Sequence, residues 1–279
     1  MTIGIVTDTT CDIPATLVAE HNIVVVPAYV NMGEESYLDG VELSREEFYT
    51  RLPGCNPPPT TAAPSPGQFQ QAYEQLAARG VTEILSIHLS STLSNLYAAA
   101  QMAAQAIENV KVLAIDARQA SMGLGFTVLA AARAAAAGRT LPDVAEMLKG
   151  LIQRTHLVAV IDTLEFLRRS GRLNSLQAGL GSLLQVKPIV KLHDGVILTE
   201  RVRTRGQAMQ RLLALLHERL PVENLAVMHV RARDRAEELL AEVRHLLPAG
   251  EIPIIEAAPA IAVHVGPGAL GFVSVSAEQ

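Results

Sequence analysis

Residues 84–97 read Ile-Leu-Ser-Ile-His-Leu-Ser-Ser-Thr-Leu-Ser-Asn-Leu-Tyr. The first six are mainly Ile and Leu and run into a polar cluster, which predicts a strand over 84–89. Ser, Thr and Asn are the residues that begin helices, and the alanine-rich pattern after them predicts a helix over 96–107. A strand that passes through a short loop into a helix is the repeating unit of α/β proteins.

The same alternation extends through the first half of the chain. Three helix starts are predicted: Asp12 as an N-cap before Pro14, a Ser-x-x-Gln capping box that opens a helix from Ser65 to about residue 79, and Thr140 before Leu141-Pro142. The last follows an alanine-rich helix that Gly138 ends. This order predicts a mainly parallel sheet with helices on its faces. Its other strands are expected at 3–7, 23–30 and 110–115.

The strand–helix alternation ends after a strand predicted at 156–161. His193-Asp194-Gly195 is typical of a hairpin turn, with strands expected at 183–192 and 196–199 on either side. We therefore expect two domains, an N-terminal α/β domain over 1–155 and a C-terminal α/β domain with a mixed sheet over 156–279, with the ligand between them. The remaining expected elements are helices at 205–220 and 233–247 and strands at 225–230, 252–255 and 261–265.

Composition excludes several classes of function. The 279 residues include 49% hydrophobic and 18% charged residues, enough to bury a core in one large or two modest domains. The net charge of −5 argues against a nucleic-acid surface, because phosphate binding needs a basic patch. No apolar run reaches the roughly 18 residues of a membrane span, so we expect no integral membrane association.

Cysteine use and the N-terminus point to the cytoplasm. Cys11 and Cys55 are the two cysteines, and they form neither a disulfide framework nor a pair at zinc spacing. The first residues lack the basic region of a signal peptide and reach Asp8 almost at once. No Walker A, G-x-S-x-G or H-E-x-x-H motif occurs. We therefore expect no cofactor and no metal.

Two hydroxyl-bearing loops are candidate binding elements. Residues 90–95 carry four hydroxyl groups, more than one helix cap uses, at the carboxyl end of a predicted parallel strand. Open α/β sheets bind ligands at that edge, and a helix N-terminus favours a carboxylate or a phosphate. Helix capping is the plainer reading. Residues 59–65 form the second loop, whose plainer reading is turn chemistry.

Gly266-Pro267-Gly268-Ala269-Leu270-Gly271 matches the G-x-G-x-x-G pattern of dinucleotide sites. Only eight residues follow it, so the crossover helix and the downstream acid of that fold have no room. A tight backbone turn explains these glycines, and His264 immediately before them stays without an assigned role. Arg168, Arg169 and Arg172 form a basic cluster, and 201–205 contains a second one. A solvated face is the ordinary explanation of such clusters.

In order along the chain, these segments resemble the DegV family of bacterial fatty-acid-binding proteins. The matching segments cover essentially the whole chain, although Ala62, Ala63, Asn95, Leu96 and Ser170 depart from the family pattern. They are Thr7 to Asp12, Pro59 to Ser65, Ser90 to Tyr97, Leu164 to Leu173, Lys187-Pro188, Asp194-Gly195, Arg203-Thr204 and His264 to Gly271.

The resemblance implies a long-chain fatty acid between two α/β domains, held by its carboxylate at Thr61, Ser94 and His264. It implies that a separate ATP-dependent fatty acid kinase converts the carboxyl group to an acyl phosphate, a step in phospholipid synthesis. Arg172 and Arg203 match arginines associated with phosphoryl transfer or partner docking. The chain would then be a lipid-binding carrier without activity of its own and with no catalytic residue.

Two other functions stay open at this stage. One is a small-molecule hydrolase that uses Ser94 and His264, which turnover of an ester by the protein alone would reveal. The other is a nucleic-acid-binding regulator built on 201–235, where basic residues are interleaved with acids. Salt-dependent retention on DNA would identify it.

Overall fold

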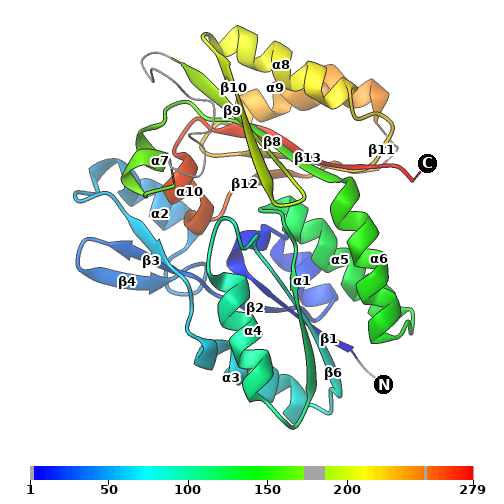
Figure 1. Cartoon of the computed structure of the whole chain (residues 1–279). Helices are drawn as coiled ribbons and strands as arrows, with labels where there is room; N and C mark the ends of the chain where they lie inside the picture. The colour runs from blue at the N-terminus through cyan, green and yellow to red at the C-terminus, as the bar shows by residue number, and fades with distance from the viewer. Residues whose placement is uncertain (1–2, 173–185, 248–249, 279) are drawn as a thin grey trace.

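The computed structural model describes residues 3–172, 186–247 and 250–278. The described chain forms three sheets (Figure 1). The first has four strands in the order β2-β1-β6-β7, all parallel. Its strands are β1 (Ile3–Asp8), β2 (Val24–Val26), β6 (Glu83–His88) and β7 (Lys111–Asp116). The predicted parallel sheet is therefore confirmed.

Helices cover both faces of this parallel sheet. The strands β1 and β6 are buried along almost their whole length, as expected of strands with a helix layer on each side. On one face Phe69, Tyr73 and Leu76 pack with the alanines of α4. This face carries α3 (Pro66–Ala78) and α4 (Leu96–Ala106), and the other carries α1 (Ala15–Glu20), α5 (Met122–Ala136) and α6 (Leu141–Arg154).

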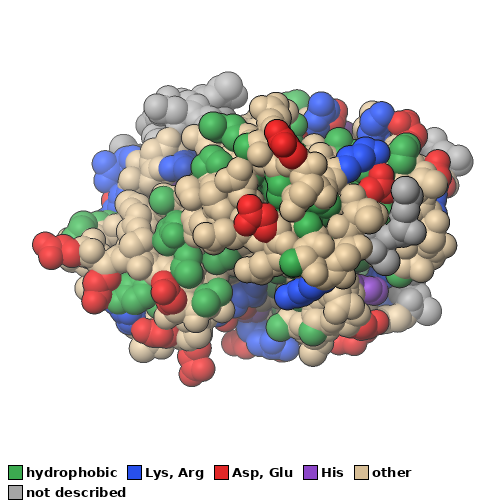
Figure 2. All heavy atoms as spheres, turned by 90° about the horizontal axis from the view of Figure 1, so that it is seen from below, with side chains coloured by type: hydrophobic (Ala, Val, Ile, Leu, Met, Phe, Trp, Pro, Cys, Tyr) green, Lys and Arg blue, Asp and Glu red, His purple; other side chains and the backbone are tan. Residues whose placement is uncertain are grey.

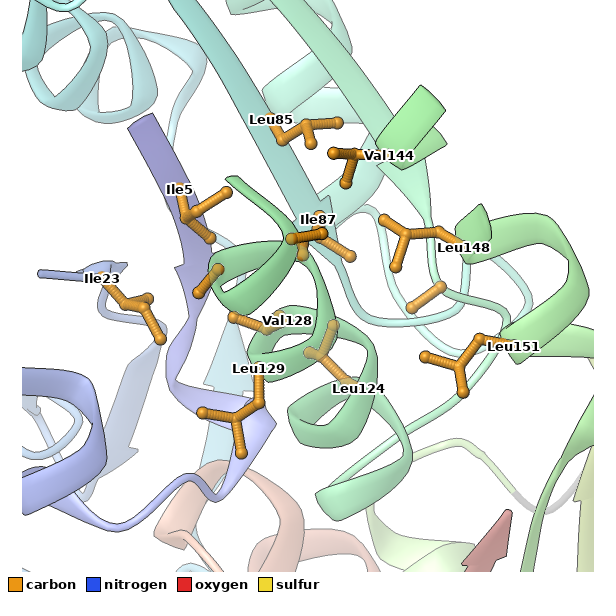
Figure 3. Packing of buried hydrophobic residues seen from close by; sticks show 14 of the residues in the cluster. Ile5, Ile23, Leu85, Ile87, Leu124, Val128, Leu129, Val144, Leu148 and Leu151 are labelled. Carbon is orange, nitrogen blue, oxygen red and sulfur yellow. The ribbon is translucent and has the colours of Figure 1, made fainter. Parts of the chain in front are cut away.

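The helices α5 and α6 form a layer between two sheets (Figure 1). Figure 3 shows Leu124 and Val128 of α5 and Leu148 of α6 among Ile5 and Ile87 of the parallel sheet. Val275 of the second large sheet belongs to the same cluster. The start of α6 follows its sequence signals, because the Thr140 hydroxyl accepts the Asp143 N–H and Pro142 lies in the first turn.

The second large sheet has six strands in the order β10-β9-β8-β13-β11-β12. All its neighbours are antiparallel except β11 and β12, so the predicted mixed sheet is confirmed. Its strands are β8 (Thr155–Val160), β9 (Lys187–His193), β10 (Val196–Val202), β11 (Val222–His229), β12 (Ile254–Glu256) and β13 (Leu270–Ser276), and its outer face carries α8 (Arg205–His217) and α9 (Arg233–Val243).

The predicted hairpin turn at His193-Asp194-Gly195 is confirmed. His193 pairs with Val196, and Asp194 and Gly195 both have positive φ, as a two-residue turn between twisted strands requires. The strand predicted at 183–192 is observed from Lys187, and its first three residues lie outside the described ranges. The second sheet begins with β8 at Thr155. The two-domain division near that residue stays a prediction.

A small antiparallel sheet, β4-β3-β5, lies beside the second sheet (Figure 1). The segments are β3 (Tyr29–Met32), β4 (Glu35–Leu38), β5 (Thr60–Ala62), α2 (Arg45–Arg51), α10 (Pro259–Val265) and α7 (Glu165–Arg169). Val30 of this sheet and Phe48 of the helix α2 pack with Val230, which follows β11, and with Val263 of the helix α10. Residues early in the chain thus share a core with residues near its end.

Two sequence-based elements are wrong. The strand predicted at 23–30 is two strands in different sheets, β2 and β3, because Pro27 interrupts the ladder after Val26. The strand predicted at 261–265 is the helix α10, with Pro259 in its first turn and Gly266 ending it at a φ of 74°. A short apolar run does not reveal its period. The true strand, β13, begins four residues after Gly266.

Two helical glycines provide a matched test of how closely these layers pack. A Cβ on Gly125 would lie 2.5 Å from the backbone oxygen of Cys11, whereas a Cβ on Gly150 would meet nothing within 4 Å. We expect Gly125→Ala to lower the free energy of unfolding by about 1–3 kcal/mol and Gly150→Ala to raise it by about 0.5–1 kcal/mol. Urea denaturation measures both. Equal effects at the two sites would contradict this packing.

Candidate functional site

A cavity of about 200 Å³ lies between the inner face of the six-stranded sheet and the loops at the carboxyl edge of the parallel sheet. A void with room for several waters is not a packing defect in a protein interior. Its walls are mainly aliphatic, and they come from β8, β9, β10, β11, α10 and the loop before α4. Representative wall residues are Leu93, Leu157, Ala159, Leu192, Ile197 and Met228.

A hydrogen-bonded polar pair lies in this mainly apolar lining. The Oγ1 of Thr61, on β5, lies 3.0 Å from the Nε2 of His264, on α10, and both side chains line the cavity. Burial, together with the nearby positive charge of Arg172, lowers the pKa of His264 to about 4. At neutral pH the imidazole is therefore uncharged. Its Nδ1 is buried and has no hydrogen-bond partner among the described residues.

Ser94 is the hydroxyl of the 90–95 loop that lines the cavity. The others are engaged elsewhere, since Ser91 donates to Asp116 at 2.5 Å and the hydroxyls of Ser90 and Thr92 lie 2.9 Å apart. Ser94 is half-buried, and its Oγ has one long contact of 3.4 Å with the Leu96 N–H. The expectation that this loop precedes the helix at the sheet's carboxyl edge is confirmed.

The position of His264 is set by how the other end of α10 is held. Two buried carboxylates accept backbone N–H groups there: Asp12 takes the N–H of Ala258 at 2.8 Å and Asp39 takes that of Ala260 at 3.2 Å. Negative charge at a helix N-terminus is favourable, because the first N–H groups have no partner within the helix. Burial raises the pKa of Asp39 to about 7.

The assignment of Asp12 as an N-cap of the following helix is wrong. The helix α1 begins at Ala15, and Pro14 occupies the cap. Asp12 is instead 1% exposed, with a φ of 54°, and it accepts hydrogen bonds from Arg45 at 3.0 Å and from Ser121 at 2.5 Å. Its partners lie 33 and 109 residues away, so local spacing gave no signal for them.

The structure separates the two predicted arginines. Arg172 is half-buried, lines the cavity, and donates from Nη1 to the Ser170 carbonyl oxygen at 2.9 Å. Arg203 is exposed and lines a different, shallow groove with Arg201 and Arg211. Thr61, Ser94, His264 and Arg172 are therefore brought to one cavity, whereas Arg203 is not. The match to the family segment at Leu173 lies outside the described residues.

The glycine-rich segment after His264 is a tight turn, as the sequence predicts. Gly266 and Gly268 have φ values of 74° and 85°. A Cβ on Gly266 would lie 2.2 Å from a ring carbon of Phe166, on α7, so this glycine lets α7 and α10 approach each other. Close approach continues at Gly271 in β13, where a Cβ would lie 2.2 Å from the Val158 carbonyl oxygen. These glycines shape the wall beside His264.

Ser94 and His264 do not form a nucleophile–base pair. Within the described residues, His264 bonds to Thr61, and no acid orients its other nitrogen. A hydrolytic triad needs both contacts. The hydrolase reading is therefore not favoured.

A Ser-His-Asp chain does occur elsewhere, and sequence reasoning missed it. His88 Nδ1 lies 3.0 Å from Asp8 Oδ2, and its Nε2 lies 2.6 Å from Ser86 Oγ. All three residues have 0% exposure, so no substrate reaches them. Asp8 also accepts the hydroxyl of Thr10, which lines the cavity. The sequence did contain a signal for this contact, because Asp8 and His88 are polar residues that end the adjacent strands β1 and β6.

Ser121 and His229 are two further cavity residues that the sequence analysis did not identify. Ser121 has a φ of 51° and a ψ of −138°, a backbone conformation rare for a non-glycine residue and typical of functional sites. His229 is 4% exposed, and burial lowers its pKa. No local pattern marked either residue.

Several arginines of 201–235 are paired with acids. Arg205 bonds to Asp162 at 2.7 Å, and Arg211 bonds to Glu200 at 2.7 Å. Figure 2 shows the opposite end of the molecule, where acidic and basic side chains are also interspersed. Within the described ranges no helix has the length and apolar character to span a bilayer, and no group of three metal-ligating side chains occurs.

Comparison with known proteins identifies the family. The sequence model for "Uncharacterised protein, DegV family" matches residues 2–277. The chain belongs to the DegV family. A DegV domain-containing protein of Streptomyces coelicolor is 37% identical over 97% of both chains. A solved structure described as fatty acid binding of a DegV family protein from Thermus thermophilus is 32% identical, with a TM-score of 0.90 over 99% of this chain and 100% of that one.

A second solved DegV protein agrees equally well. The structure described as DegV, a fatty acid binding protein from Bacillus subtilis, is 32% identical with a TM-score of 0.90, and it covers 99% of this chain and 100% of its own. At this similarity the arrangement of the sheets is a property of the DegV fold. The cavity in this DegV chain therefore lies within a framework shared with proteins described as binding fatty acids.

The carboxylate of Asp39 predicts a pH dependence of stability. Its folded-state pKa of about 7 lies above the ordinary value of 3.8. The folded state therefore binds the proton more tightly, and stability is lost as pH rises through the folded pKa. We expect Asp39 to lower the free energy of unfolding by up to about 4 kcal/mol between pH 4 and 7. Urea denaturation across this range measures the slope.

Asp39→Asn should flatten that slope, because the amide keeps an acceptor for the Ala260 N–H but does not titrate. The matched control is Asp234→Asn, at an exposed position of α9, which should leave the slope unchanged. A slope that Asp39→Asn leaves intact would show that Asp39 does not titrate in this range.

Proposed function

We propose that this DegV chain binds a long-chain fatty acid in the cavity and presents its carboxyl group to a separate ATP-dependent fatty acid kinase, which forms the acyl phosphate. The observation that carries the proposal is a mainly apolar cavity whose few polar lining residues include Ser94 and the hydrogen-bonded pair Thr61 and His264. A molecule with one polar end and a long apolar tail matches that arrangement. The solved relatives described as binding fatty acids support it.

The energetics divide the work between tail and head group. Burying a methylene contributes about 0.8 kcal/mol, so about 14 methylenes provide roughly 11 kcal/mol before the entropy of binding is subtracted. A neutral hydrogen bond contributes only about 1 kcal/mol. The aliphatic walls therefore set affinity, and the hydroxyls of Thr61 and Ser94 with His264 fix the direction of the carboxyl group.

The charge at the cavity suits a carboxylate. His264 is neutral at pH 7, because burial holds its pKa at about 4. It offers a hydrogen bond rather than a charge. Arg172, which lines the same cavity, carries the positive charge that compensates a carboxylate. Ala62 and Ala63 line the cavity beside Thr61, so the polar part of the lining is narrow there.

A carrier role also follows from what this site offers chemically. Phosphoryl transfer is achieved mainly by positioning and charge stabilisation. Among the described residues the cavity offers a hydroxyl–imidazole pair, Thr61 and His264, but no acid that orients the imidazole as in a hydrolytic triad. We therefore assign the nucleotide and the transfer step to the kinase, acting in the cytoplasm, and assign no reaction to this chain alone.

Purified protein should retain a fatty acid of about 14–18 carbons, because an apolar cavity favours an apolar occupant over water. Mass spectrometry of an organic extract measures this. Ala159→Phe, which fills the cavity from β8, should lose the lipid, and Ala98→Phe at an exposed position of α4 should keep it. Folded wild-type protein that is lipid-free and rejects added fatty acids would overturn the proposal.

Arg172→Ala should keep its lipid and lose most acyl-phosphate formation with a cognate kinase and ATP. A guanidinium matches phosphoryl oxygens and stays charged, and this one lies at the cavity. The matched control is Arg169→Ala, an exposed arginine that pairs with Glu165 on α7 and should change neither measurement. If the Arg172→Ala variant supports normal acyl-phosphate formation by the kinase, Arg172 has only a structural role. If the variant loses its lipid, Arg172 takes part in binding the fatty acid.

A further inference from the structure

Three unpartnered polar atoms gather on the outer face of the six-stranded sheet, away from the cavity. Seven buried side-chain nitrogen or oxygen atoms in the described residues have no hydrogen-bond partner. Three of them are Nδ1 of His156, Oγ of Ser274 and Nε of Arg219. Buried polar atoms are nearly always bonded, so three such atoms in one region need an explanation.

The sheet register places the first two side by side. Ser274 of β13 is directly opposite His156 of β8, and directly opposite residues of antiparallel strands project from the same face. Val158 and Phe272, two residues away on each strand, pack under α8 and α9. His156 and Ser274 therefore face this helix layer, whereas Leu157 lines the cavity on the opposite face.

His193 and Arg219 complete the group. His193 of β9 is paired with His156, and their rings stack with centroids 4.0 Å apart. Arg219 follows α8, which packs on β8 and β9, and its positive charge acts on His156. Ser274 is 0% exposed and His193 is exposed, so the group extends from the interior to the surface.

The charge of this group is unbalanced. Arg219 is half-buried, and none of the ion pairs among the described residues includes it. Its acidic neighbour Glu218 is bonded to Arg211 at 2.9 Å. On β9, Lys191 is engaged by Glu200. A desolvated guanidinium is costly without a counter-charge, and an ordered water would satisfy a donor but not the charge.

We propose that His156, His193, Arg219 and Ser274 form a binding site for a small oxyanion, of which inorganic phosphate is the simplest. The hydroxyl of Ser274 and the Nε–H of Arg219 are donors, and the Nδ1 of His156 is a donor in one tautomer. The site is distinct from the cavity that the proposed function uses. An anion there balances Arg219 and completes three buried hydrogen-bonding groups at once.

The imidazole of His156 reports occupancy directly. Burial, the charge of Arg219 and the interaction with His193 together lower its pKa to about 3. An oxyanion within the group opposes all three effects, so binding raises this pKa. The ring resonances of His156 and His193 should therefore move together as the anion is added.

The test is a titration of the full-length, lipid-loaded protein with inorganic phosphate at constant ionic strength, followed by NMR of the histidine rings. We expect saturable shifts at His156 and His193. Arg219→Met should weaken binding at least tenfold and Ser274→Ala about fivefold, whereas Arg139→Met, at an exposed turn before α6, should leave it unchanged. Parallel titrations with sulfate and with acetate distinguish a site for tetrahedral oxyanions from a site that also binds carboxylates.

Each outcome decides between an anion and water. Shifts that follow phosphate and sulfate but not chloride support the site, and equal shifts with acetate extend it to carboxylates. Linear shifts without saturation, or shifts that persist in both Arg219→Met and Ser274→Ala, would leave only ordered water and overturn the proposal. If Arg219→Met fails to fold, Ser274→Ala alone carries the comparison. The result is independent of lipid binding, because the cavity lies on the other face.

Discussion

Asp12 carries a carboxylate that is almost completely buried where the three sheets meet. It accepts the Ala258 N–H before α10, the Arg45 guanidinium from α2 and the hydroxyl of Ser121 before α5. Burial raises its pKa, and these hydrogen bonds and the positive charge of Arg45 oppose that effect. A buried carboxylate is tolerated only when such partners surround it. Asp12 therefore links the start of α10, the helix α2 and the start of α5 to one another.

The cavity depends on that arrangement because apolar walls tend to collapse. Aliphatic faces would gain contacts by closing over an empty space. Polar contacts oppose this collapse. Asp12 and Asp39 accept hydrogen bonds at the start of α10, and His264 at the other end of α10 is hydrogen-bonded to Thr61 of the small sheet. Charged and hydrogen-bonded groups at the edges thus maintain an apolar space in the middle. A site of this kind can bind a tail by burial and still orient a head group.

The sequence predicts helices, strands and turns better than it predicts which of them contact each other in space. Caps and turns such as Thr140 and Asp194-Gly195 are set by local backbone chemistry, so their positions could be read directly. The helical state of 261–265 could not, because these residues belong to the seven-residue helix α10, whose start is held by carboxylates more than 200 positions away. The same limit applies to the site. Thr61 and His264 were named by resemblance to a family, and 203 residues separate the two atoms that meet.

Burial explains why the same residue types have opposite roles in this fold. Ser86, His88 and Asp8 have the connectivity of a hydrolytic triad, yet all are fully buried, and Tyr73 lies 2.7 Å from the serine. That chain joins strand ends and gives no reagent access to the serine. His264 lines a cavity but has no acid partner in the described part of the chain, and its low pKa makes it a weak base at pH 7. His88 therefore belongs to a triad that no substrate can reach, whereas His264 lines a cavity but is not part of a triad among the described residues. A neutral imidazole beside a hydroxyl can hydrogen-bond a carboxyl group and fix its direction, which is what the proposed carrier role requires.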